Sequence, residues 1–516
     1  MQKKKRQVLK TVASGAGIIF FGSLFAYFAN FIYQIIISRY LGPADYGLIS
    51  LGQMVLNVGM ILSLLGLNEG LVRYSAYYLG RKNVAKIKGV LLAVLKITIP
   101  ASILVTFLLV FFSKFIAIQI FKNAEFIPIL IVFALIIPIH VLLRIIAQFF
   151  LALKKPGYNQ FIRVIFRNMV NIILVLAVVL IGGNVFQVSL AYLISVVVSA
   201  IFGIVLLECK IFPILRNKIK PFYNYKKLIM FSLPLLFTGV FLKIMGWADT
   251  FFIGFFKTAA EVGVYNVAFP VAAAMGMFLA AFGTIFYPII SELLGKKERF
   301  EIGHIFEVIM RWIFAVTFPI FLLILLFPKD ILKIMFGKAY VAGSTALLIL
   351  TAAYFINVIT GPGVHTLKAF KKVKFIFYLN FGIVILNLVL NILLIPWCGI
   401  TGAAIATGIS IGLREIIIFF KVKRLIKFSY NIKYYIKYIL SAAIPLLVIY
   451  WALNTFFQSY YLITVIIALA VFVAIYLFLL LLLKSFSKED LVIIRALEKK
   501  SGLNLKFIKS FIKHFI

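Results

Sequence analysis

Charged side chains inside long apolar stretches are the residues of this chain best suited to chemistry. His140 and Arg144 stand four residues apart in one stretch, and Lys96 and Lys243 lie in two others. A charge in an apolar segment of this length is costly and usually faces a polar cavity. Arg and Lys side chains that are removed from water bind phosphate groups strongly. Because cations outnumber anions here, the set predicts a site for an anionic ligand.

Simpler explanations stay open for part of this set. Lys96 is near enough to the end of its stretch to extend its ammonium group into water. Arg414 and Glu415 are adjacent near the end of another stretch, and we expect them to pair or to reach water. Neutral polar residues such as Gln34 also recur at every fourth position. They either line a wet cavity or bond neighbouring helices.

A second group of residues carries oxygen atoms of the kind that a small hard cation binds. Asp249 lies in one apolar stretch and Thr407 in another, while Asn387 and Asn391 stand one helical turn apart in a third. One carboxylate with amide and hydroxyl oxygens suits a weak, reversible sodium site. Alternatively, Asp249 is protonated or hydrogen-bonded within a helix bundle. We expect no resident cofactor, and coupling to either sodium or protons.

The apolar stretches that carry these residues predict a membrane protein. The chain has 516 residues, 64% of them hydrophobic, and a mean hydropathy of +1.12. A helix of about 20 apolar residues crosses a bilayer, and the pattern predicts about fourteen such spans. Their approximate limits are 12–38, 47–67, 89–112, 127–152, 165–183, 186–207, 229–256, 263–290, 304–327, 343–367, 375–395, 399–420, 436–456 and 461–483.

The distribution of basic residues predicts the orientation of the chain. The formal net charge is +38, from 53 basic and 15 acidic residues. The basic residues concentrate in alternate gaps between spans, such as 154–155 and 371–374, which is typical of cytoplasmic loops. Both termini are therefore expected in the cytoplasm, in a multi-pass protein of the cell (cytoplasmic) membrane. Topology explains the positive charge, so nucleic acid is not an expected partner.

A short polar turn between the first two spans is repeated later in the chain. The turn is Ser38–Gly47, and a weaker copy stands about 216 residues later at Gly254–Gly263. A second pair of segments, at 113–121 and 328–336, keeps nearly the same offset. Repeats with the same orientation are related by an axis along the membrane normal and enclose a central cavity.

Two positions of the turn are the best preserved between its copies. Asp45 matches Glu261, and Gly47 matches Gly263. We expect the glycines to tighten the turn and the acids to cap the helix that follows. Arg39 is present only in the first copy, which makes it a residue to test for function.

The predicted fold is an all-α polytopic membrane protein. It consists of two six-helix bundles related by a pseudo-twofold axis along the membrane normal, plus two extra C-terminal helices. The predicted divisions are an N-terminal six-helix lobe at 1–207, a basic cytoplasmic interfacial linker at 208–228, a C-terminal six-helix lobe at 229–421, two additional transmembrane helices at 436–484 and a basic cytoplasmic tail at 485–516.

Sequence signatures of common enzymes are missing from the chain. There is no Gly-rich phosphate loop with a lysine, no nucleophile elbow and no H-E-x-x-H. The two cysteines, Cys209 and Cys398, are far apart and predict neither a disulfide framework nor a thiolate metal site. We therefore expect a protein that is not an enzyme.

The residues of the turn carry a family resemblance. ISRYLGPADYG at 37–47 and GLNEGLVRY at 66–74 resemble polysaccharide-biosynthesis flippases of the Wzx type. These belong to the superfamily that includes multidrug and toxic-compound extruders and the lipid II flippase. The resemblance implies transfer of a lipid-linked oligosaccharide, on a polyprenyl or dolichyl phosphate or pyrophosphate, from the cytoplasmic to the outer leaflet. Alternating access between the two halves would carry the headgroup through a cationic cavity.

The resemblance also implies roles for individual residues. By position, Arg39 and Arg73 are the candidates to contact the phosphates. In the similar lipid II flippase a sodium site lies on the seventh, eleventh and twelfth helices, where this chain has Asp249, Asn387, Asn391 and Thr407. Here Asn391 replaces a carboxylate. The expected partners are the lipid-linked oligosaccharide and membrane lipids, and we expect a monomer that is linked functionally to membrane glycosyltransferases.

Three other functions compete with this one. A cation-coupled multidrug exporter of the same fold would have mainly anionic residues in its cavity. A membrane glycosyltransferase or polymerase would have a large outer loop or paired carboxylates. A scaffold without transport would have no need of mid-span cations such as Arg144 and Lys243.

Overall fold

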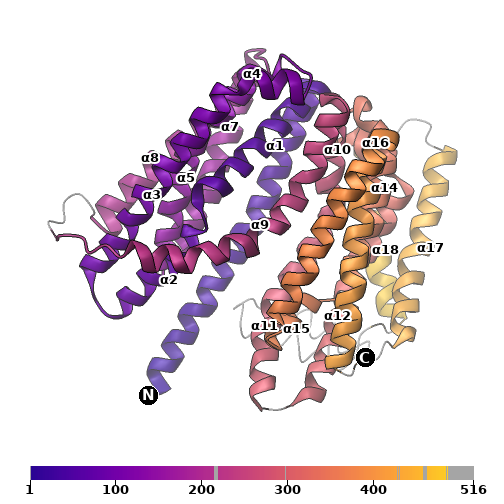
Figure 1. Ribbon diagram of the computed structural model, residues 1–516. Coiled ribbons are helices and arrows are strands. Elements are labelled where there is room, and N and C mark those ends of the chain that lie inside the picture. The colour runs from indigo at the N-terminus through magenta and orange to yellow at the C-terminus, as the bar shows by residue number, and fades with distance from the viewer. Residues whose placement is uncertain are drawn as a thin grey trace. The chain divides into compact units, whose positions relative to one another are not determined.

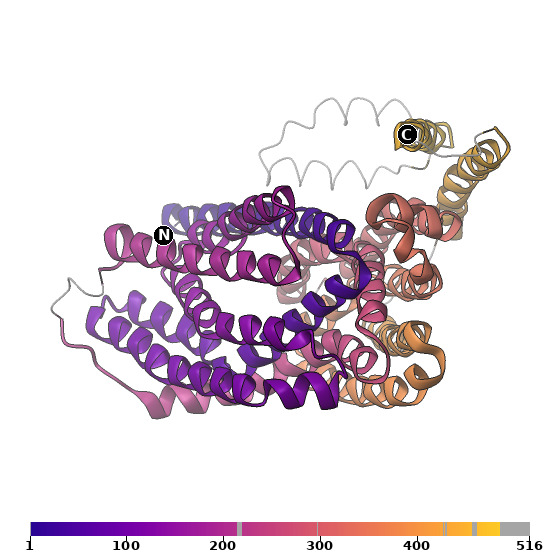
Figure 2. The same cartoon turned by 90° about the horizontal axis from the view of Figure 1, so that it is seen from above.

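The computed structural model describes residues 2–213, 219–296, 298–426, 428, 431–456, 462–483 and 485. The predicted tail beyond residue 485, and residues 214–218 of the predicted linker, lie outside this part of the chain. Within it, every regular element is a helix (Figures 1 and 2). Contacts divide the chain into two compact units, 1–267 with 391–400 and 268–390 with 401–516. In this division α9 and the first half of α10 belong to the first unit, and the predicted lobes stay a prediction.

The first unit is built from the N-terminal helices. Their bounds are α1 (Gln2–Leu64), α2 (Leu67–Gly80), α3 (Val84–Phe111), α4 (Ser113–Phe115), the π-helix η1 (Ile116–Ile120), α5 (Phe126–Ala152), α6 (Pro156–Gln160), the π-helix η2 (Phe161–Phe166), α7 (Arg167–Leu180), α8 (Val185–Leu206), the π-helix η3 (Leu207–Ile211), α9 (Tyr225–Phe256) and α10 (Ala259–Ala273). α10 and the later α16 each contribute residues to both units.

The second unit holds the remaining helices. Their bounds are α11 (Gly276–Lys296), α12 (Arg299–Leu326), α13 (Pro328–Phe336), the 3-10 helix η4 (Lys338–Gly343), α14 (Ser344–Ile359), α15 (Gly363–Ala369), α16 (Val373–Leu425), α17 (Ile432–Phe456) and α18 (Leu462–Leu482).

Two sharp kinks join pairs of spans that the sequence analysis separates. In α1 the break is at Gly42, with φ 78° and ψ 176°, and in α16 it is at Gly399, with φ 54° and ψ −135°. Glycine adopts these positive φ values without the steric cost that a Cβ brings. Pro43 follows the first kink, where its fixed φ and missing N–H suit the first turn of the next helical segment. The predicted turn at 38–47 is therefore a kink of one residue rather than a loop.

The two copies of the turn contact each other through their glycines. A Cβ added to Gly47 would lie 1.7 Å from the carbonyl oxygen of Ala259, and one added to Gly263 would lie 2.0 Å from that of Pro43. The glycines therefore allow two backbones to touch, a role different from the predicted tightening of a turn. At the start of α10 the side chain of Thr258 accepts a hydrogen bond from the N–H of Glu261, at 3.3 Å.

Helix α5 is the centre of the first unit. It packs against α1, α3 and α8 (Figure 1). Most of its apolar side chains are buried, among them Phe133, Ile137 and Val141 at 0% exposure. His140 on the same helix is buried as well, and Arg144 is half-buried.

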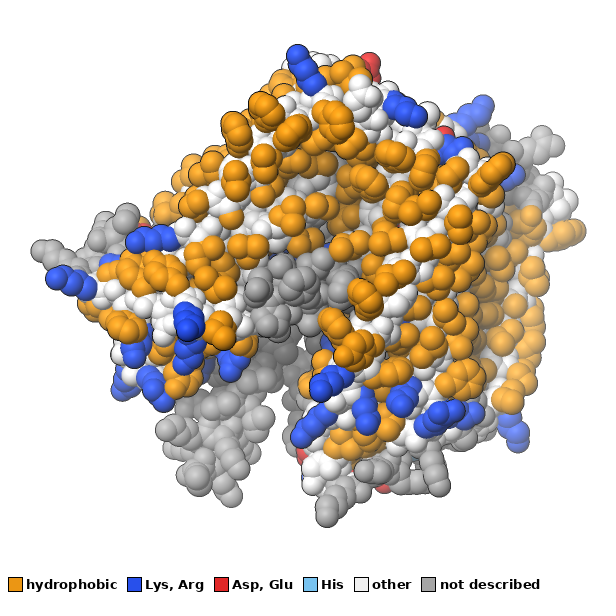
Figure 3. Space-filling view, viewed as in Figure 1, with side chains coloured by type: hydrophobic (Ala, Val, Ile, Leu, Met, Phe, Trp, Pro, Cys, Tyr) orange, Lys and Arg blue, Asp and Glu red, His pale blue; other side chains and the backbone are white. Residues whose placement is uncertain are grey.

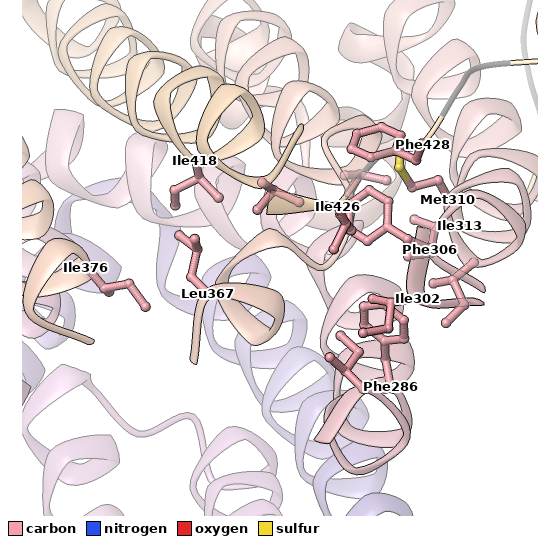
Figure 4. Packing of buried hydrophobic residues seen from close by; sticks show 14 of the residues in the cluster. Phe286, Ile302, Phe306, Met310, Ile313, Leu367, Ile376, Ile418, Ile426 and Phe428 are labelled. Atoms are coloured by element: carbon pink, nitrogen blue, oxygen red, sulfur yellow. The ribbon is translucent and has the colours of Figure 1, made fainter. Parts of the chain in front are cut away.

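The second unit has its own apolar core. Phe286, Ile302, Phe306 and Ile418 belong to a single buried cluster (Figure 4). A smaller cluster fixes α17 and α18 to α12, where the Tyr476 hydroxyl donates to the carbonyl of Ala315 at 2.6 Å. These two helices follow the repeat in sequence and pack by aromatic contact.

The surface has the character of a membrane protein. Nine helices among the described residues are long and apolar enough to cross a membrane, and the kinked α1 and α16 are two of them. Two shorter apolar helices lie at 259–273 and 467–482. In the second unit, apolar side chains cover the middle of the helices and basic ones gather at one end (Figure 3). This pattern agrees with an all-α polytopic membrane fold, whereas the number of crossings and the side of the termini stay predictions.

Candidate functional site

Three half-buried arginines of the first unit interact with one another. Arg144 is on α5, Arg163 is in the π-helix η2, and Arg167 opens α7. Each interacts electrostatically with the other two. We call these three residues the arginine cluster. The sequence analysis identified only Arg144.

His140 holds one member of the cluster in place. It is 8% exposed and contacts Nη1 of Arg167 through its Nε2, at 3.2 Å. A guanidinium group only donates hydrogen bonds, so Nε2 must be the acceptor and the proton must sit on Nδ1. Nδ1 in turn contacts the Met60 sulfur on α1. Arg167 also donates from Nη2 to the side-chain oxygen of Asn168, at 2.8 Å.

Each arginine of the cluster has a buried donor that the chain leaves unused. The Nε atoms of Arg144, Arg163 and Arg167 are buried and have no hydrogen-bond partner within the described residues. No carboxylate in this part of the chain lies within ion-pairing distance of them. Buried polar groups are normally hydrogen-bonded, and like charges in a bundle interior repel. An anion with several acceptor oxygens would suit both features.

The local backbone explains how two arginines of one helix reach the cluster. Residues Phe161–Phe166 form a π-helix between α6 and α7. A π-turn has one residue more than an α-turn, and it changes the direction of the side chains that follow. Such insertions are frequent at functional sites.

Two further charged residues lie within electrostatic range of the cluster. Lys243, on α9, is exposed and interacts with Arg144 and Glu69. Glu69, near the start of α2, is also exposed and interacts with Arg144. The predicted site residues His140, Arg144 and Lys243 are thus within electrostatic range of one another or of the cluster.

The other predicted phosphate contacts lie on aromatic rings or at an exposed position. The ammonium group of Lys96 stacks 4.6 Å from the ring centroid of Tyr223, in the segment that precedes α9. The guanidinium group of Arg73 lies 4.0 Å from the ring centroid of Phe231. Arg39 is exposed on α1, three residues before the Gly42 kink.

The predicted ion site contains a buried carboxylate. Asp249 on α9 is 2% exposed and accepts a hydrogen bond from the Tyr265 hydroxyl, at 2.5 Å. The side-chain N–H of Asn391 donates to its other oxygen, at 2.8 Å. The fit to sodium depends on Asn391, because turning its amide would present an oxygen next to the carboxylate. This donor set of neutral oxygens and one carboxylate suits weak binding of a hard cation.

The other two predicted ion ligands contact each other. Asn387 donates from its side-chain nitrogen to the hydroxyl of Thr407, at 3.1 Å, and both residues are buried. Among the described residues, no group of three or more His, Cys, Asp or Glu is suited to hold a metal ion. Arg414 and Glu415 form the ion pair that their adjacency predicts, and Arg414 also donates to Asn380, at 2.9 Å.

The sequence did contain a signal for the two missed arginines. Arg163 and Arg167 are four residues apart, and Asn171 follows after four more. This is the periodicity that singled out His140 and Arg144. The signal was missed because Arg163 falls just outside the predicted span 165–183, and Arg167 stands near its end, where basic residues are common.

Comparisons with known proteins match this architecture. The family model described as "Polysaccharide biosynthesis protein" matches residues 12–294, and the model described as "MatE" matches residues 234–393. The probable low-salt glycan biosynthesis flippase Agl15 of Haloferax volcanii is 29% identical over 40% of this chain, a match that spans 42% of that protein. A membrane protein of Methanocaldococcus jannaschii is 27% identical over 66% of this chain and 70% of its own length. The structure of lipid II flippase MurJ in an inward closed conformation is similar in fold, with a TM-score of 0.70, 18% identity and coverage of 90% of this chain and 98% of that one.

Proposed function

Because the chain belongs to the polysaccharide biosynthesis protein family, a group of multi-pass membrane proteins with flippase relatives, we propose that it moves a lipid-linked oligosaccharide across the cell membrane. The substrate would carry a phosphate or pyrophosphate between a polyprenyl or dolichyl chain and the glycan. The headgroup would cross from the cytoplasmic to the outer leaflet by alternating access. The function is transport, with no chemical reaction at the site.

The observation that supports this proposal best is the set of unused donors in the arginine cluster. A pyrophosphate offers several acceptor oxygens in a small volume, and guanidinium groups bind such oxygens through parallel N–H bonds. Binding would provide acceptors for the buried Nε atoms and would offset the mutual repulsion of the three cations. The three arginines would also neutralise the charge of the anion. This matters inside an apolar bundle, where an unpaired charge is costly.

The first experiment measures binding of a short-chain polyprenyl pyrophosphate to the purified protein. We expect Arg144→Gln and Arg167→Gln to lose about 1.5–3 kcal/mol each, the contribution of a hydrogen bond to a charged group. This corresponds to affinity that is weaker by about 10- to 100-fold. The rate of transfer of a labelled lipid-linked oligosaccharide in reconstituted vesicles should fall by a similar factor.

The matched control is Arg81→Gln. The Arg81 guanidinium stacks on Tyr77, 4.6 Å from the ring centroid, and is exposed. This variant loses the same charge outside the cluster, so its affinity should stay within about twofold of the unchanged protein. Unchanged pyrophosphate binding in both cluster variants would remove the proposal.

Asp249 supports a second part of the proposal, that sodium drives the cycle. A buried carboxylate next to the amide of Asn391 gives a cation two oxygen ligands once the amide turns. Proton coupling through the same carboxylate is the alternative. The two are separated by asking whether transport in vesicles follows an imposed sodium gradient or a pH gradient.

The alternative function is a cation-coupled multidrug exporter, which the match to the MatE family model favours. Three clustered guanidinium groups would repel a cationic drug. The same vesicles distinguish the two functions, because uptake of a fluorescent cationic dye without transfer of the lipid-linked glycan would favour the exporter.

A further inference from the structure

A charged pocket lies at the ends of two helices in the second unit, apart from the arginine cluster. It has a volume of about 140 Å³. One wall is α12 and the other is the start of α17, two helices that pack together. Its lining residues are His304, Glu307, Val308, Arg311, Asn431, Tyr434 and Tyr435. We call this the α12–α17 pocket.

The size and position of the pocket limit what it can hold. Drug-sized ligands occupy pockets of about 300–1,000 Å³, so a sugar chain or a drug is too large. A single headgroup fits. α17 begins at Ile432, so the lining residues Tyr434 and Tyr435 lie in the N-terminal turn of that helix, where the helix dipole favours an anion. In the predicted orientation this end faces the cytoplasm, at the level of lipid headgroups.

Arg311 is the residue best placed to select the ligand. Its side chain is only 6% exposed and stands in a helix that is otherwise mostly apolar, where a charged group is unusual. Its guanidinium carbon lies 4.3 Å from the ring centroid of Tyr434. Stacking uses the face of the guanidinium group and directs its N–H groups along the plane, the geometry that suits the oxygens of a phosphate.

The charges around the pocket favour an anion with a polar extension. The ammonium group of Lys437 lies 5.8 Å from the same Tyr434 ring, so two cations flank one aromatic side chain. His304 adds an imidazole to the lining, and Glu307 is the one acid among the lining residues. A phosphate ester that carries hydroxyl or ammonium donors can pair its phosphate with the cations and its donors with Glu307.

We propose that the α12–α17 pocket binds the phosphate group of a phospholipid headgroup from the surrounding leaflet. This site is independent of the transport function proposed above, because it uses residues of the second unit and the arginine cluster belongs to the first. Binding would join α17 to α12 next to the aromatic cluster that fixes α17 and α18. The lipid would therefore stabilise the second unit.

Native mass spectrometry of the purified protein with added phosphatidylglycerol tests the proposal. We expect Arg311→Gln to weaken binding at least tenfold, and Glu307→Gln to keep or tighten it, since this variant removes the negative charge of the lining. A variant that gains affinity guards against a trivial loss by misfolding. Equal binding in the unchanged protein and in Arg311→Gln, or a loss of binding in Glu307→Gln, would overturn the proposal.

The matched control and the second ligand decide the source of the phosphate. Lys421 stacks on Phe375, 5.3 Å from the ring centroid, in the same unit and outside the pocket. Lys421→Gln should bind phosphatidylglycerol as tightly as the unchanged protein. If it loses as much affinity as Arg311→Gln, the loss reflects net charge and not the pocket, and the proposal is wrong. Soluble glycerol phosphate should compete only weakly. If it binds as tightly as the lipid with the same dependence on Arg311, the assignment to a lipid is wrong.

Discussion

At the scale of single residues, Arg167 combines a side chain that is held in place with a buried donor that is unused in the described chain. Arg167 is fixed by His140 and Asn168, and yet its Nε remains without a partner in the described chain. The side chain is thus positioned by two of its nitrogen atoms and offers a third. Such pre-positioning reduces the entropy that a ligand must overcome on binding.

His140 tests this arrangement without removing a charge from the cluster. In His140→Leu the Nη1 donor of Arg167 loses its acceptor in a buried place, which costs about 1–3 kcal/mol. We expect weaker binding of polyprenyl pyrophosphate and reduced transport. His140→Gln keeps an acceptor and should recover most of both activities. If the Leu and Gln variants lose binding equally, His140 does more than position Arg167.

Asp249 gives a residue-scale test of the ion site. Sodium at ten times its dissociation constant should stabilise the protein by about 1.4 kcal/mol, while potassium at the same ionic strength should not. Thermal unfolding in detergent measures the difference. Asp249→Asn should abolish it, because the amide removes the negative charge and keeps the shape. An identical sodium response in the variant and in the unchanged protein would exclude Asp249 as a ligand.

At the scale of elements, the segment before α9 packs on the start of α3. The N–H of Phe222 donates to the carbonyl of Ala85 near the start of α3, at 3.1 Å, and Lys86 stacks 5.3 Å from the Phe222 ring centroid. A Cβ on Gly89 would lie 1.9 Å from the carbonyl oxygen of Phe222. The described part of the predicted interfacial linker is therefore held by α3 through a glycine.

Gly89→Ala should detach this segment. The added methyl group cannot be accommodated without moving backbone, and overpacking of this kind costs about 1–3 kcal/mol. We expect limited proteolysis to cut between α8 and α9 faster than in the unchanged protein. Gly80→Ala is the control, because a Cβ there has nothing within 4 Å. Equal cleavage rates in the two variants would show that the contact is not needed.

At the scale of the whole molecule, hydropathy and charge were enough to predict an all-helical membrane fold. Apolar runs of membrane length appear as helices in the predicted order. The site was predicted less completely. Arg144 and His140 stood out because they share a helical face inside a predicted span, whereas Arg163 and Arg167 have the same spacing but lie at the edge of a span and are placed by a π-turn. The contacts of Arg73 with Phe231 and of Lys96 with Tyr223 join segments far apart in the sequence, so they could not be predicted from it.

The orientation of the chain can be tested with its own cysteines. Cys209 and Cys398 are both free and exposed. The predicted topology puts Cys209 on the cytoplasmic side and Cys398 on the outer side. A membrane-impermeant maleimide added to intact cells should label Cys398 and leave Cys209 unlabelled until the cells are opened. Substitution of each cysteine by serine assigns the signals, and the reverse labelling pattern would invert the topology.

The contact between the glycines of the repeated turn has the reciprocity of an interface between two identical chains. Gly47 contacts the carbonyl of residue 259, and Gly263 contacts the carbonyl of residue 43. Residues 43 and 259 occupy matching positions in the two copies, as do the two glycines. In a symmetric contact the two sides are energetically equivalent. Gly47→Ala and Gly263→Ala should therefore lower thermal stability by similar amounts, about 1–3 kcal/mol.

The double variant follows from the same equivalence. Once one Cβ has pushed the two backbones apart, the second has part of its space already, so the effects should sum to less than the two singles. Thermal unfolding of the four proteins in a double-mutant cycle measures this coupling. Strict additivity would mean that the glycines act independently and that the reciprocity is geometric only. A sub-additive result would show that the two glycines, one from each copy of the turn, are energetically coupled.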